Sequence, residues 1–292
     1  MTRSRTSPTL LEGRAAAIAG GAGSIGGEIS RIFAAHGARV LFADKARDRV
    51  ETLVDEINTA GGHAEGLVAD LTAPQAMDEF ADRATTFGPT DILVNCLGHY
   101  LDSVEPFEQT SEATWQELYE INLLPVFRAC KLLIPGMRER RYGRVINFSS
   151  VEGIRASPHL AVYGAFKGAV DAFTRSLAVE TAADNVLVNS IAVDKTRSHQ
   201  TNFLRVPDEY ERLIPTWVPR GRFAEGVDIA KIALFLASDL ADWIVGATLL
   251  ADGGTIAAGG WYRTPSGWSS QPLLHQYFES SETNQTRPGS LQ

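Results

Sequence analysis

Tyr163 and Lys167 stand four residues apart in AVYGAFKGAVDAFTRSLAVE, a segment with the pattern of a helix. Side chains at positions i and i+4 lie on one helical face, so the phenol and the amine should be neighbours. A Lys ammonium stabilises a phenolate, and we therefore expect it to lower the pKa of Tyr163 from its ordinary value of about 10. A phenol with a lowered pKa can act as a general acid and base near neutral pH.

A third reactive group, Ser150, ends the apolar run RVINFSS at residues 144–150. We predict that this run is a buried strand. A hydroxyl at the carboxyl end of such a strand points into the crevice where open α/β sheets bind ligands. The sequence therefore places Ser150 in the same site as the Tyr–Lys pair.

A glycine-rich turn near the start of the chain indicates what this site binds. The apolar segment 15–19 is a strand candidate, GGAGSIG follows at residues 20–26, and a helical pattern continues over 28–36. Glycines at such a turn permit the close approach of a pyrophosphate, which lies on the N-terminus of the helix. The arrangement is typical of a dinucleotide site.

The type of dinucleotide is indicated by the next strand candidate, RVLFAD, which ends in Asp44. An acid at this point accepts hydrogen bonds from the ribose 2′- and 3′-hydroxyls and repels a 2′-phosphate. Lys45 and Arg47 are nearby cations that weaken this preference. We predict that NAD is the cofactor.

Taken in order, these motifs resemble those of the short-chain dehydrogenase/reductase family, in its single-domain branch, over roughly residues 12–256. The catalytic residues that the resemblance implies are Asn122, Ser150, Tyr163 and Lys167. Among them Asn122 would support a proton-relay water, and Lys167 would also bind the nicotinamide ribose. The cofactor contacts that it implies are Gly20, Gly23, Ser24, Ile25, Gly26, Asp44, Asp70, Leu71, Asn95, Gly98, Tyr163 and Lys167.

The chain also departs from the family pattern. Ser24 stands where the single-domain branch has its second glycine, and the resulting glycine spacing is closer to the sugar-nucleotide branch. Val193 and Asp194 stand where the family has Pro-Gly, in a turn that flanks the nicotinamide. An acid in that turn bears on nicotinamide geometry or on the choice of substrate.

Strand and helix patterns alternate along the chain. The strand candidates are 14–19, 39–43, 64–69, 91–95, 144–149, 186–192 and 248–251. The helical patterns are 25–36, 46–60, 74–86, 112–139, 161–183 and 227–238. Such alternation implies a parallel sheet with helices on both faces. We predict an α/β fold with a doubly wound, Rossmann-type parallel sheet of about seven strands in a single domain.

The remaining segments divide around this domain. We expect a flexible N-terminal segment over 1–11, the dinucleotide-binding catalytic domain over 12–256, and a C-terminal extension over 257–292. Residues 195–226 break the alternation and carry several prolines. A long loop in a compact domain is often functional, so we expect a lid there.

Composition narrows the setting. The net charge of −8 argues against a nucleic-acid surface, and no apolar run is long enough to span a membrane. Two cysteines do not make a disulfide framework, and residues 2–8 do not resemble a signal peptide. We expect a cytoplasmic enzyme without a catalytic metal, because no His, Cys, Asp and Glu cluster has metal-ligand spacing.

Several other residues could contact a substrate or only solvent. His99 and Tyr100 follow the predicted cofactor loop, and Glu152 lies two residues after Ser150, where it could meet a polar substrate group. His159 is more typical of an exposed position. The aromatic residues that could line an apolar pocket are Phe203, Trp217, Trp261 and Trp268.

The function that fits these motifs best is an NAD-dependent oxidoreductase that interconverts a secondary alcohol and a ketone. The aromatic residues of the lid and tail favour a cyclic or bulky hydrophobic substrate. A sugar-nucleotide-type epimerase or lyase, and a non-catalytic dinucleotide-binding scaffold, remain as alternatives. The resemblance implies a homo-oligomer, a dimer or a tetramer, in which residues 255–280 help close a substrate pocket or a subunit interface.

Overall fold

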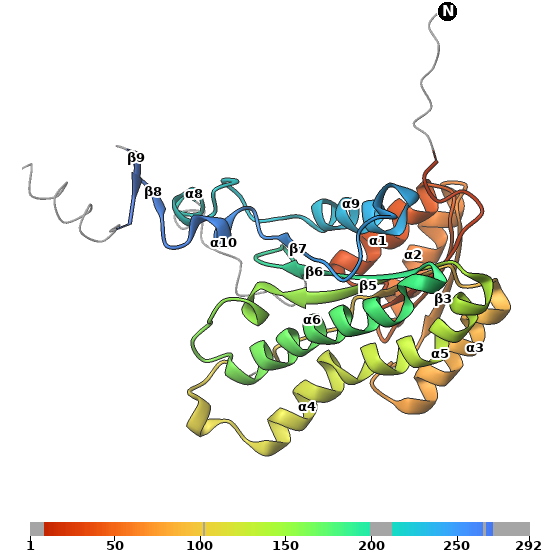
Figure 1. Ribbon diagram of the computed structural model, residues 1–292, viewed down its shortest axis with the longest axis horizontal. Coiled ribbons are helices and arrows are strands. Elements are labelled where there is room, and N and C mark those ends of the chain that lie inside the picture. The colour runs from red at the N-terminus through yellow and green to blue at the C-terminus, as the bar shows by residue number, and fades with distance from the viewer. Residues whose placement is uncertain (1–8, 102, 199–211, 265–266, 271–292) are drawn as a thin grey trace, which may run out of the picture.

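The computed structural model describes residues 9–101, 103–198, 212–264 and 267–270. Seven parallel strands in the order β3-β2-β1-β4-β5-β6-β7 form its central sheet (Figure 1). The strands are β1 (Ala15–Ala19), β2 (Arg39–Asp44), β3 (His63–Val68), β4 (Ile92–Asn95), β5 (Gly143–Ser150), β6 (Val186–Val193) and β7 (Thr248–Ala251). The strand order reverses between β1 and β4, and ligands of doubly wound sheets bind at such a switch point.

Helices cover both faces of the sheet. They are α1 (Ser24–Ala35), α2 (Arg47–Thr59), α3 (Pro74–Phe87), α4 (Glu112–Asn122), α5 (Leu124–Arg140), α6 (Ala161–Thr181) and α9 (Gly226–Ala237). α1, α2 and α9 pack on one face, and α3, α5 and α6 pack on the other (Figure 1). Within β1, Ile18 contributes to the first core cluster and Ala17 to the second, as the two-residue period of a strand requires. The predicted fold class is confirmed, and every predicted strand is present with bounds within one residue.

The helix predicted over 112–139 is in fact two helices, α4 and α5, with a break at Leu123. Pro125 explains the break, because its nitrogen has no hydrogen to donate to a carbonyl four residues earlier. Leu123 accordingly departs from helical geometry, with φ −121° and ψ −49°. As a result Asn122, which is fully buried, ends α4.

The insertion at 195–226 is closed at its base. The N–H of Arg197 donates to the carbonyl of Ala224 at 2.9 Å, and the N–H of Ala224 donates to the carbonyl of Lys195 at 3.0 Å. Further along the insertion, α8 (Ile214–Trp217) belongs to a small apolar cluster with Phe223. Residues 199–211, including Phe203, lie outside the described residues.

At the N-terminal end of the described chain, Leu11 is buried and its N–H donates to the carbonyl of His36 at 2.9 Å, so Leu11 packs with the domain. At the other end, α10 (Thr255–Ala258) leads into an antiparallel hairpin of β8 (Tyr262–Thr264) and β9 (Gly267–Ser269). The hairpin packs beside α8 and lies away from the central sheet in Figure 1.

The turn between β1 and α1 depends on one close approach of backbone to backbone. Gly20 has φ +80°, and a Cβ placed on Gly26 would lie 2.1 Å from the carbonyl oxygen of Gly20. Ser30 stabilises the turn, because its hydroxyl lies 3.0 Å from the carbonyl oxygens of both Gly21 and Gly26 and can donate to either. The shape of the turn therefore requires glycine at residue 26.

We predict that Gly26→Ala lowers the melting temperature, because the added methyl group meets main chain that cannot rotate away; overpacking of this kind costs roughly 1–3 kcal/mol. Gly27→Ala is the matched control. Its Cβ would lie no closer than 3.4 Å to any atom, the flexible end of Arg31, and alanine is about 1 kcal/mol more favourable than glycine inside a helix. Differential scanning calorimetry of both variants checks this. Equal melting temperatures would contradict the role given to Gly26.

Candidate active site

A cavity of about 690 Å³ lies along the carboxyl ends of the central strands. It runs from the glycine-rich turn, past Asp44 and Asp70, to Ser150, Tyr163 and Lys167. Every cofactor contact predicted from the sequence lines this cavity except Asn95. Residues that lie far apart in the sequence are therefore brought together at one edge of the sheet.

The glycine-rich turn forms one end of the cavity. α1 begins at Ser24, so the first turn of the helix and the positive end of its dipole lie beside the cavity. A Cβ on Gly23 would have no closer neighbour than the carbonyl oxygen of Gly20 at 3.4 Å, which leaves this side of the turn open. These features fit a pyrophosphate.

Asp44, at the end of β2, sits beyond the turn. Its Oδ1 accepts from the N–H of Ala46 at 3.0 Å and from Nη2 of Arg49 at 3.3 Å. Arg47, the cation singled out from the sequence, pairs instead with Glu51 on the exposed side of α2. The sequence does not indicate a role for Arg49. Arg49 contacts Asp44 because it lies in the first turn of α2, which begins close to the end of β2.

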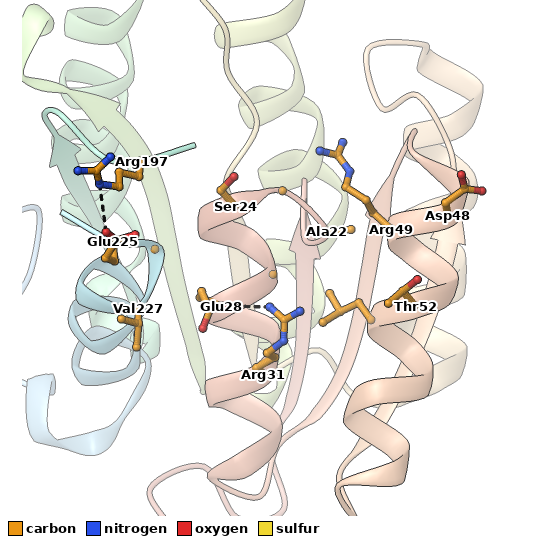
Figure 2. Close-up of a pocket in the computed structure, with 14 residues that line it drawn as sticks. Ala22, Ser24, Glu28, Arg31, Asp48, Arg49, Thr52, Arg197, Glu225 and Val227 are labelled. Carbon is orange, nitrogen blue, oxygen red and sulfur yellow. Dashed lines mark hydrogen bonds and ion pairs between the residues drawn. The ribbon is translucent and has the colours of Figure 1, made fainter. Parts of the chain in front are cut away.

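A second hollow, of about 570 Å³, lies on the outer side of the turn between α1, α2 and α9 (Figure 2). Charged side chains line it, and several of them pair with each other. Arg31 contacts Glu28 at 3.0 Å, and Arg197 contacts Glu225 at 3.3 Å (Figure 2). Arg49 lines both hollows, so it connects the second one to the Asp44 end of the main cavity.

Asp70, after β3, organises a turn at the rim. Its Oδ1 accepts from the N–H of Thr72 at 3.0 Å and from the hydroxyl of Thr72 at 2.7 Å. The hydroxyl contact is the main reason that the pKa of Asp70 lies below its ordinary value. Asp70 and Leu71 both line the cavity.

Asn95 has a different place from the one predicted. Its side chain is buried between β4 and β5, and Nδ2 donates to Oδ1 of Asn147 at 2.8 Å and to Sγ of Cys130 at 3.6 Å. It therefore ties the strand ends to α5 behind the cavity and does not line it. Cys96, the next residue, does line the cavity, and burial raises the pKa of its thiol to about 12, so it stays a thiol at ordinary pH.

Asn122 also lies behind the cavity wall. Its Nδ2 donates to the carbonyls of His99 at 2.8 Å and Leu118 at 2.9 Å, and its Oδ1 accepts from the N–H of His99 at 3.0 Å. Gly98 separates it from Lys167, because a Cβ there would lie 3.0 Å from Oδ1 of Asn122 and 2.5 Å from Nζ of Lys167. Because α4 ends at Asn122, the side-chain amide of Asn122 lies on the opposite side of Gly98 from Lys167.

Polar groups on the buried face of α6 fix the position of that helix. The carboxylate of Asp171 accepts from the hydroxyl of Ser149 at 2.7 Å, of Ser190 at 2.7 Å and of Thr248 at 3.1 Å. These three partners lie on β5, β6 and β7. One turn earlier on the same face, Nζ of Lys167 donates to the carbonyl of Phe148 at 3.2 Å.

Ser150, Tyr163 and Lys167 line the same part of the cavity. Tyr163 is hydrogen-bonded to the hydroxyl of Ser150, and Nζ of Lys167 lies 5.8 Å from the centre of the Tyr163 ring. Tyr100 stands edge-on to Tyr163, with the ring centres 6.3 Å apart. His99 and Tyr100 both line the cavity. His159 is exposed, as expected from the sequence.

The pKa of Tyr163 is raised above its ordinary value, opposite to the direction predicted from the sequence. Burial is the largest cause, since it penalises the phenolate. The hydrogen bond between the hydroxyl groups of Tyr163 and Ser150 acts in the other direction, but the negative charge of Glu152 and the neighbouring Tyr100 add to the effect of burial. Burial also lowers the pKa of Lys167, to about 8, so its ammonium group loses its proton at a lower pH than an exposed lysine does.

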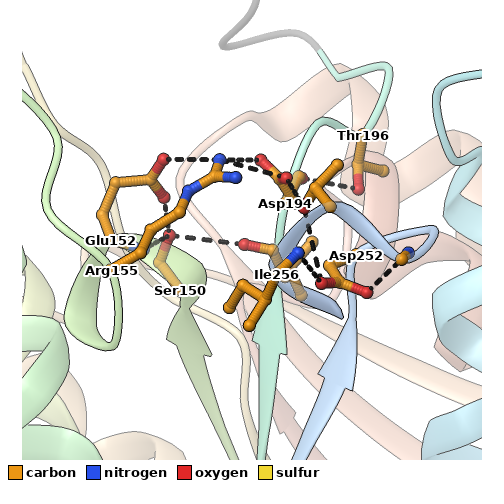
Figure 3. A network of polar contacts seen from close by, with 10 residues as sticks. Ser150, Glu152, Arg155, Asp194, Thr196, Asp252 and Ile256 are labelled. Carbon is orange, nitrogen blue, oxygen red and sulfur yellow. Dashed lines mark hydrogen bonds and ion pairs between the residues drawn. The ribbon is translucent and has the colours of Figure 1, made fainter. Parts of the chain in front are cut away.

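A chain of charged contacts continues from Ser150 to the turn after β6 (Figure 3). The hydroxyl of Ser150 donates to Oε2 of Glu152, and Oε1 of Glu152 lies 3.6 Å from Nη2 of Arg155. Arg155 in turn contacts both carboxylate oxygens of Asp194, at 3.0 and 3.1 Å, and the hydroxyl of Thr255 donates to Asp194 at 2.5 Å. The acid that departs from the family pattern is thus paired, and Arg155 is the partner that sequence reasoning missed.

Among the described aromatic residues of the lid and tail, Trp217, Trp261 and Trp268 are not part of the lining of the cavity that holds Ser150. Trp217 packs edge-on against Phe223, with the ring centres 5.6 Å apart. Trp261 is 53% exposed and Trp268 is 51% exposed. Within the described ranges, no helix is long and apolar enough to cross a bilayer, and no group of three or more metal-ligating side chains is placed to hold an ion.

Comparison with known proteins gives consistent matches over most of the chain. The family model for enoyl-(acyl carrier protein) reductases matches residues 20–255. Galactitol 2-dehydrogenase (L-tagatose-forming) of Cereibacter sphaeroides is 35% identical over 249 residues, which are 84% of this chain and 95% of the relative.

Two solved structures are similar in fold as well as sequence. A protein from Beutenbergia cavernae, described as an NAD(P)-dependent gluconate 5-dehydrogenase and holding NADP at low occupancy, has a TM-score of 0.80 and 34% identity over 86% of this chain and 99% of its own. A 7α-hydroxysteroid dehydrogenase, in complex with NADH and 7-oxo glycochenodeoxycholic acid, has a TM-score of 0.79 and 30% identity over 84% of this chain and 95% of its own.

We predict that Lys167→Met changes the pH dependence of stability. The pKa of Lys167 is about 8 in the folded chain, against an ordinary value of 10.5, so the unfolded chain binds more protons between these values. The free energy of unfolding of the wild type should therefore rise with pH across this window. Below about pH 8 the burial penalty acts in full, and the Met variant should be the more stable protein there.

Urea unfolding without cofactor at pH 7.0 and pH 9.5 measures the effect. The advantage of the Met variant over wild type should shrink at the higher pH. Lys131→Met, on the exposed face of α5, gives the effect of removing a surface lysine. An advantage of the Lys167 variant that does not change with pH would contradict the burial penalty.

Proposed function

Because the chain belongs to the short-chain dehydrogenase/reductase family, we propose that it interconverts a secondary alcohol and a ketone with NAD(H) as the hydride carrier. The observation that carries this proposal is the meeting of Ser150, Tyr163 and Lys167 in one cavity with the glycine-rich turn. The dehydrogenases that it resembles align over nearly their whole length. The chain itself is therefore an oxidoreductase by family, and the substrate and cofactor preference are what we propose.

Each of the four predicted catalytic residues has its own role in the proposed reaction. When bound, the nicotinamide cofactor would supply the hydride acceptor for oxidation and the hydride donor for reduction. Tyr163 takes the proton from the substrate hydroxyl during oxidation and returns it during reduction. Ser150 holds the same substrate oxygen by a hydrogen bond. Lys167 would bind the nicotinamide ribose and supply positive charge near Tyr163, and Asn122 would support a water that relays protons to Lys167.

Two alternatives have less support. The epimerase or lyase hypothesis depends on the glycine spacing alone, and the relatives compared above are dehydrogenases. The hypothesis of a non-catalytic scaffold depends on Asp194 in the turn that flanks the nicotinamide. An unpaired carboxylate there would be expected to interfere with catalysis. The pairing of Asp194 with Arg155 removes that objection to catalysis.

The substrate class predicted from the sequence, a cyclic or bulky hydrophobic alcohol, stays a prediction. The relatives include proteins named for a sugar alcohol and for a bile-acid steroid, so this family scaffold accommodates both polar and apolar substrates. Polar groups, notably Glu152 and Asp194, line the cavity next to Ser150. These groups favour a substrate with more than one polar substituent, whatever its size.

We further propose a homo-oligomer, a dimer or a tetramer, as the resemblance implies. Closed symmetric assemblies are the usual state of soluble enzymes. The half-exposed Trp261 and Trp268 of the terminal hairpin are apolar surface that a second subunit could cover. The mass of the protein in solution decides between the two states.

Tyr163→Phe should lower kcat by about 10²–10⁴, because it removes the general acid and base but keeps the ring. Binding of NADH, followed by fluorescence, should survive. Tyr119→Phe is the matched control, since Tyr119 lies on α4 with its ring against Phe166 and outside the cavity lining. A Tyr163→Phe enzyme with most of the wild-type kcat would show that the proton passes through another group.

The enzyme should have a higher kcat/KM with NAD than with NADP, because Asp44 repels a 2′-phosphate. Asp44→Ser should lower the ratio of kcat/KM with NAD to kcat/KM with NADP, because serine carries no charge to repel the 2′-phosphate. The serine hydroxyl can still accept from the N–H of Ala46. Adding Arg49→Ala to Asp44→Ser should reduce NADP use again, because Arg49 is the cation released by the first change. Steady-state kinetics with both cofactors measure these ratios, and a wild type that uses NADP as well as NAD would refute the preference.

A further inference from the structure

The hydroxyl of Ser150 is already engaged before any substrate is considered. Its single proton is directed to Oε2 of Glu152, with the carbonyl of Val193 as a more distant acceptor at 3.3 Å. We infer that Glu152 determines the substrate class, and that the enzyme selects substrates with a hydroxyl on the carbon next to the reacting one: vicinal diols and α-hydroxy ketones. This inference rests on the function proposed above.

Glu152 is held in place for this role. The short helical turn η2 (Val151–Gly153) follows β5 directly and folds the side chain of Glu152 back to Ser150 (Figure 3). The side chain is only 10% exposed, and it lines the cavity. Arg155 anchors the other carboxylate oxygen at 3.6 Å, and Asp194, itself 2% exposed, anchors Arg155.

The chemistry of the two groups creates a requirement. A carboxylate only accepts hydrogen bonds, and a serine hydroxyl has one proton to donate. In the reaction that proton must go to the substrate oxygen, which leaves Oε2 of Glu152 without a donor. A buried carboxylate that loses a hydrogen bond costs free energy unless another donor replaces it.

A second hydroxyl on the substrate is that replacement. Hydroxyl groups on neighbouring carbons in a gauche arrangement lie within hydrogen-bond distance of each other, as the hydroxyl of Ser150 and Oε2 of Glu152 do. While Ser150 holds the reacting oxygen, the neighbouring hydroxyl can donate to Glu152. A substrate without it leaves Glu152 in competition for the proton of Ser150.

The charges around Glu152 favour a neutral hydroxyl over an ionised group. Arg155 is shared between Glu152 and Asp194, so two carboxylates face one guanidinium. A carboxylate on the substrate would add a third negative charge here. A substrate ammonium would have to compete with Arg155, which is already fixed by two contacts to Asp194.

The test compares substrates that differ by one hydroxyl. The stereoisomers of butane-2,3-diol are measured against the enantiomers of butan-2-ol in oxidation, and 3-hydroxybutan-2-one is measured against butan-2-one in reduction. Each pair is assayed with NAD and with NADP at 340 nm. The enzymes are wild type, Glu152→Ala, the shape-conserving Glu152→Gln, and Glu79→Ala on the exposed side of α3 as control.

We expect wild type and Glu79→Ala to favour the hydroxylated member of each pair by about tenfold or more in kcat/KM, as expected when a buried polar group loses its partner. In Glu152→Ala this ratio should fall to within about threefold of unity, because the second hydroxyl of the substrate loses its acceptor. Glu152→Gln, whose amide oxygen still accepts, should keep part of the preference. If Glu152 only stabilised the fold, its replacement would lower kcat/KM equally for both substrates and leave their ratio unchanged.

Either an unchanged ratio in the variants or equal use of both substrates by wild type would overturn the inference and leave the proposed function standing. Failure of wild type to turn over any secondary alcohol or ketone, with either cofactor, would overturn the proposed function and this inference with it.

Discussion

The carboxylate of Asp171, buried under α6, is the interaction on which the site depends. Taking an ion out of water costs several kcal/mol unless hydrogen bonds replace the lost hydration. Here hydroxyls from three neighbouring strands supply them, and they do so for only one rotation of the helix. Because Tyr163 and Lys167 share the face of Asp171, satisfying this one acid also sets both of them beside Ser150.

The same low-polarity surroundings set the protonation of the site. Burial and the charge of Glu152 both favour the neutral phenol of Tyr163, and burial lowers the pKa of Lys167 to about 8. A neutral phenol is ready to donate a proton, which is what reduction of a ketone requires. Oxidation requires the phenolate, so added positive charge near the phenol matters more in that direction.

The strands could be predicted from sequence because a sheet covered on both faces reads as apolar runs between turns, and Ser150, Tyr163 and Lys167 because their spacing is local. The break at Leu123 could also have been found, from Pro125. By contrast, Arg49 and Arg155 gain their roles from the direction in which α2 and η2 leave the sheet. The pKa of Tyr163 could not be predicted from spacing, since burial is the main cause of its shift and the charge of Glu152 adds to it.

The closed base of the insertion at 195–226 bears on how this protein could change over evolutionary time. Its two ends are already hydrogen-bonded to each other at Lys195, Arg197 and Ala224, so the sheet does not depend on the length of chain between them. Doubling the length of a flexible loop costs only about 0.6 kcal/mol in closure entropy. Segments of other lengths and sequences could therefore be exchanged at this point, and the range of accepted molecules could drift while the hydride and proton chemistry is inherited intact.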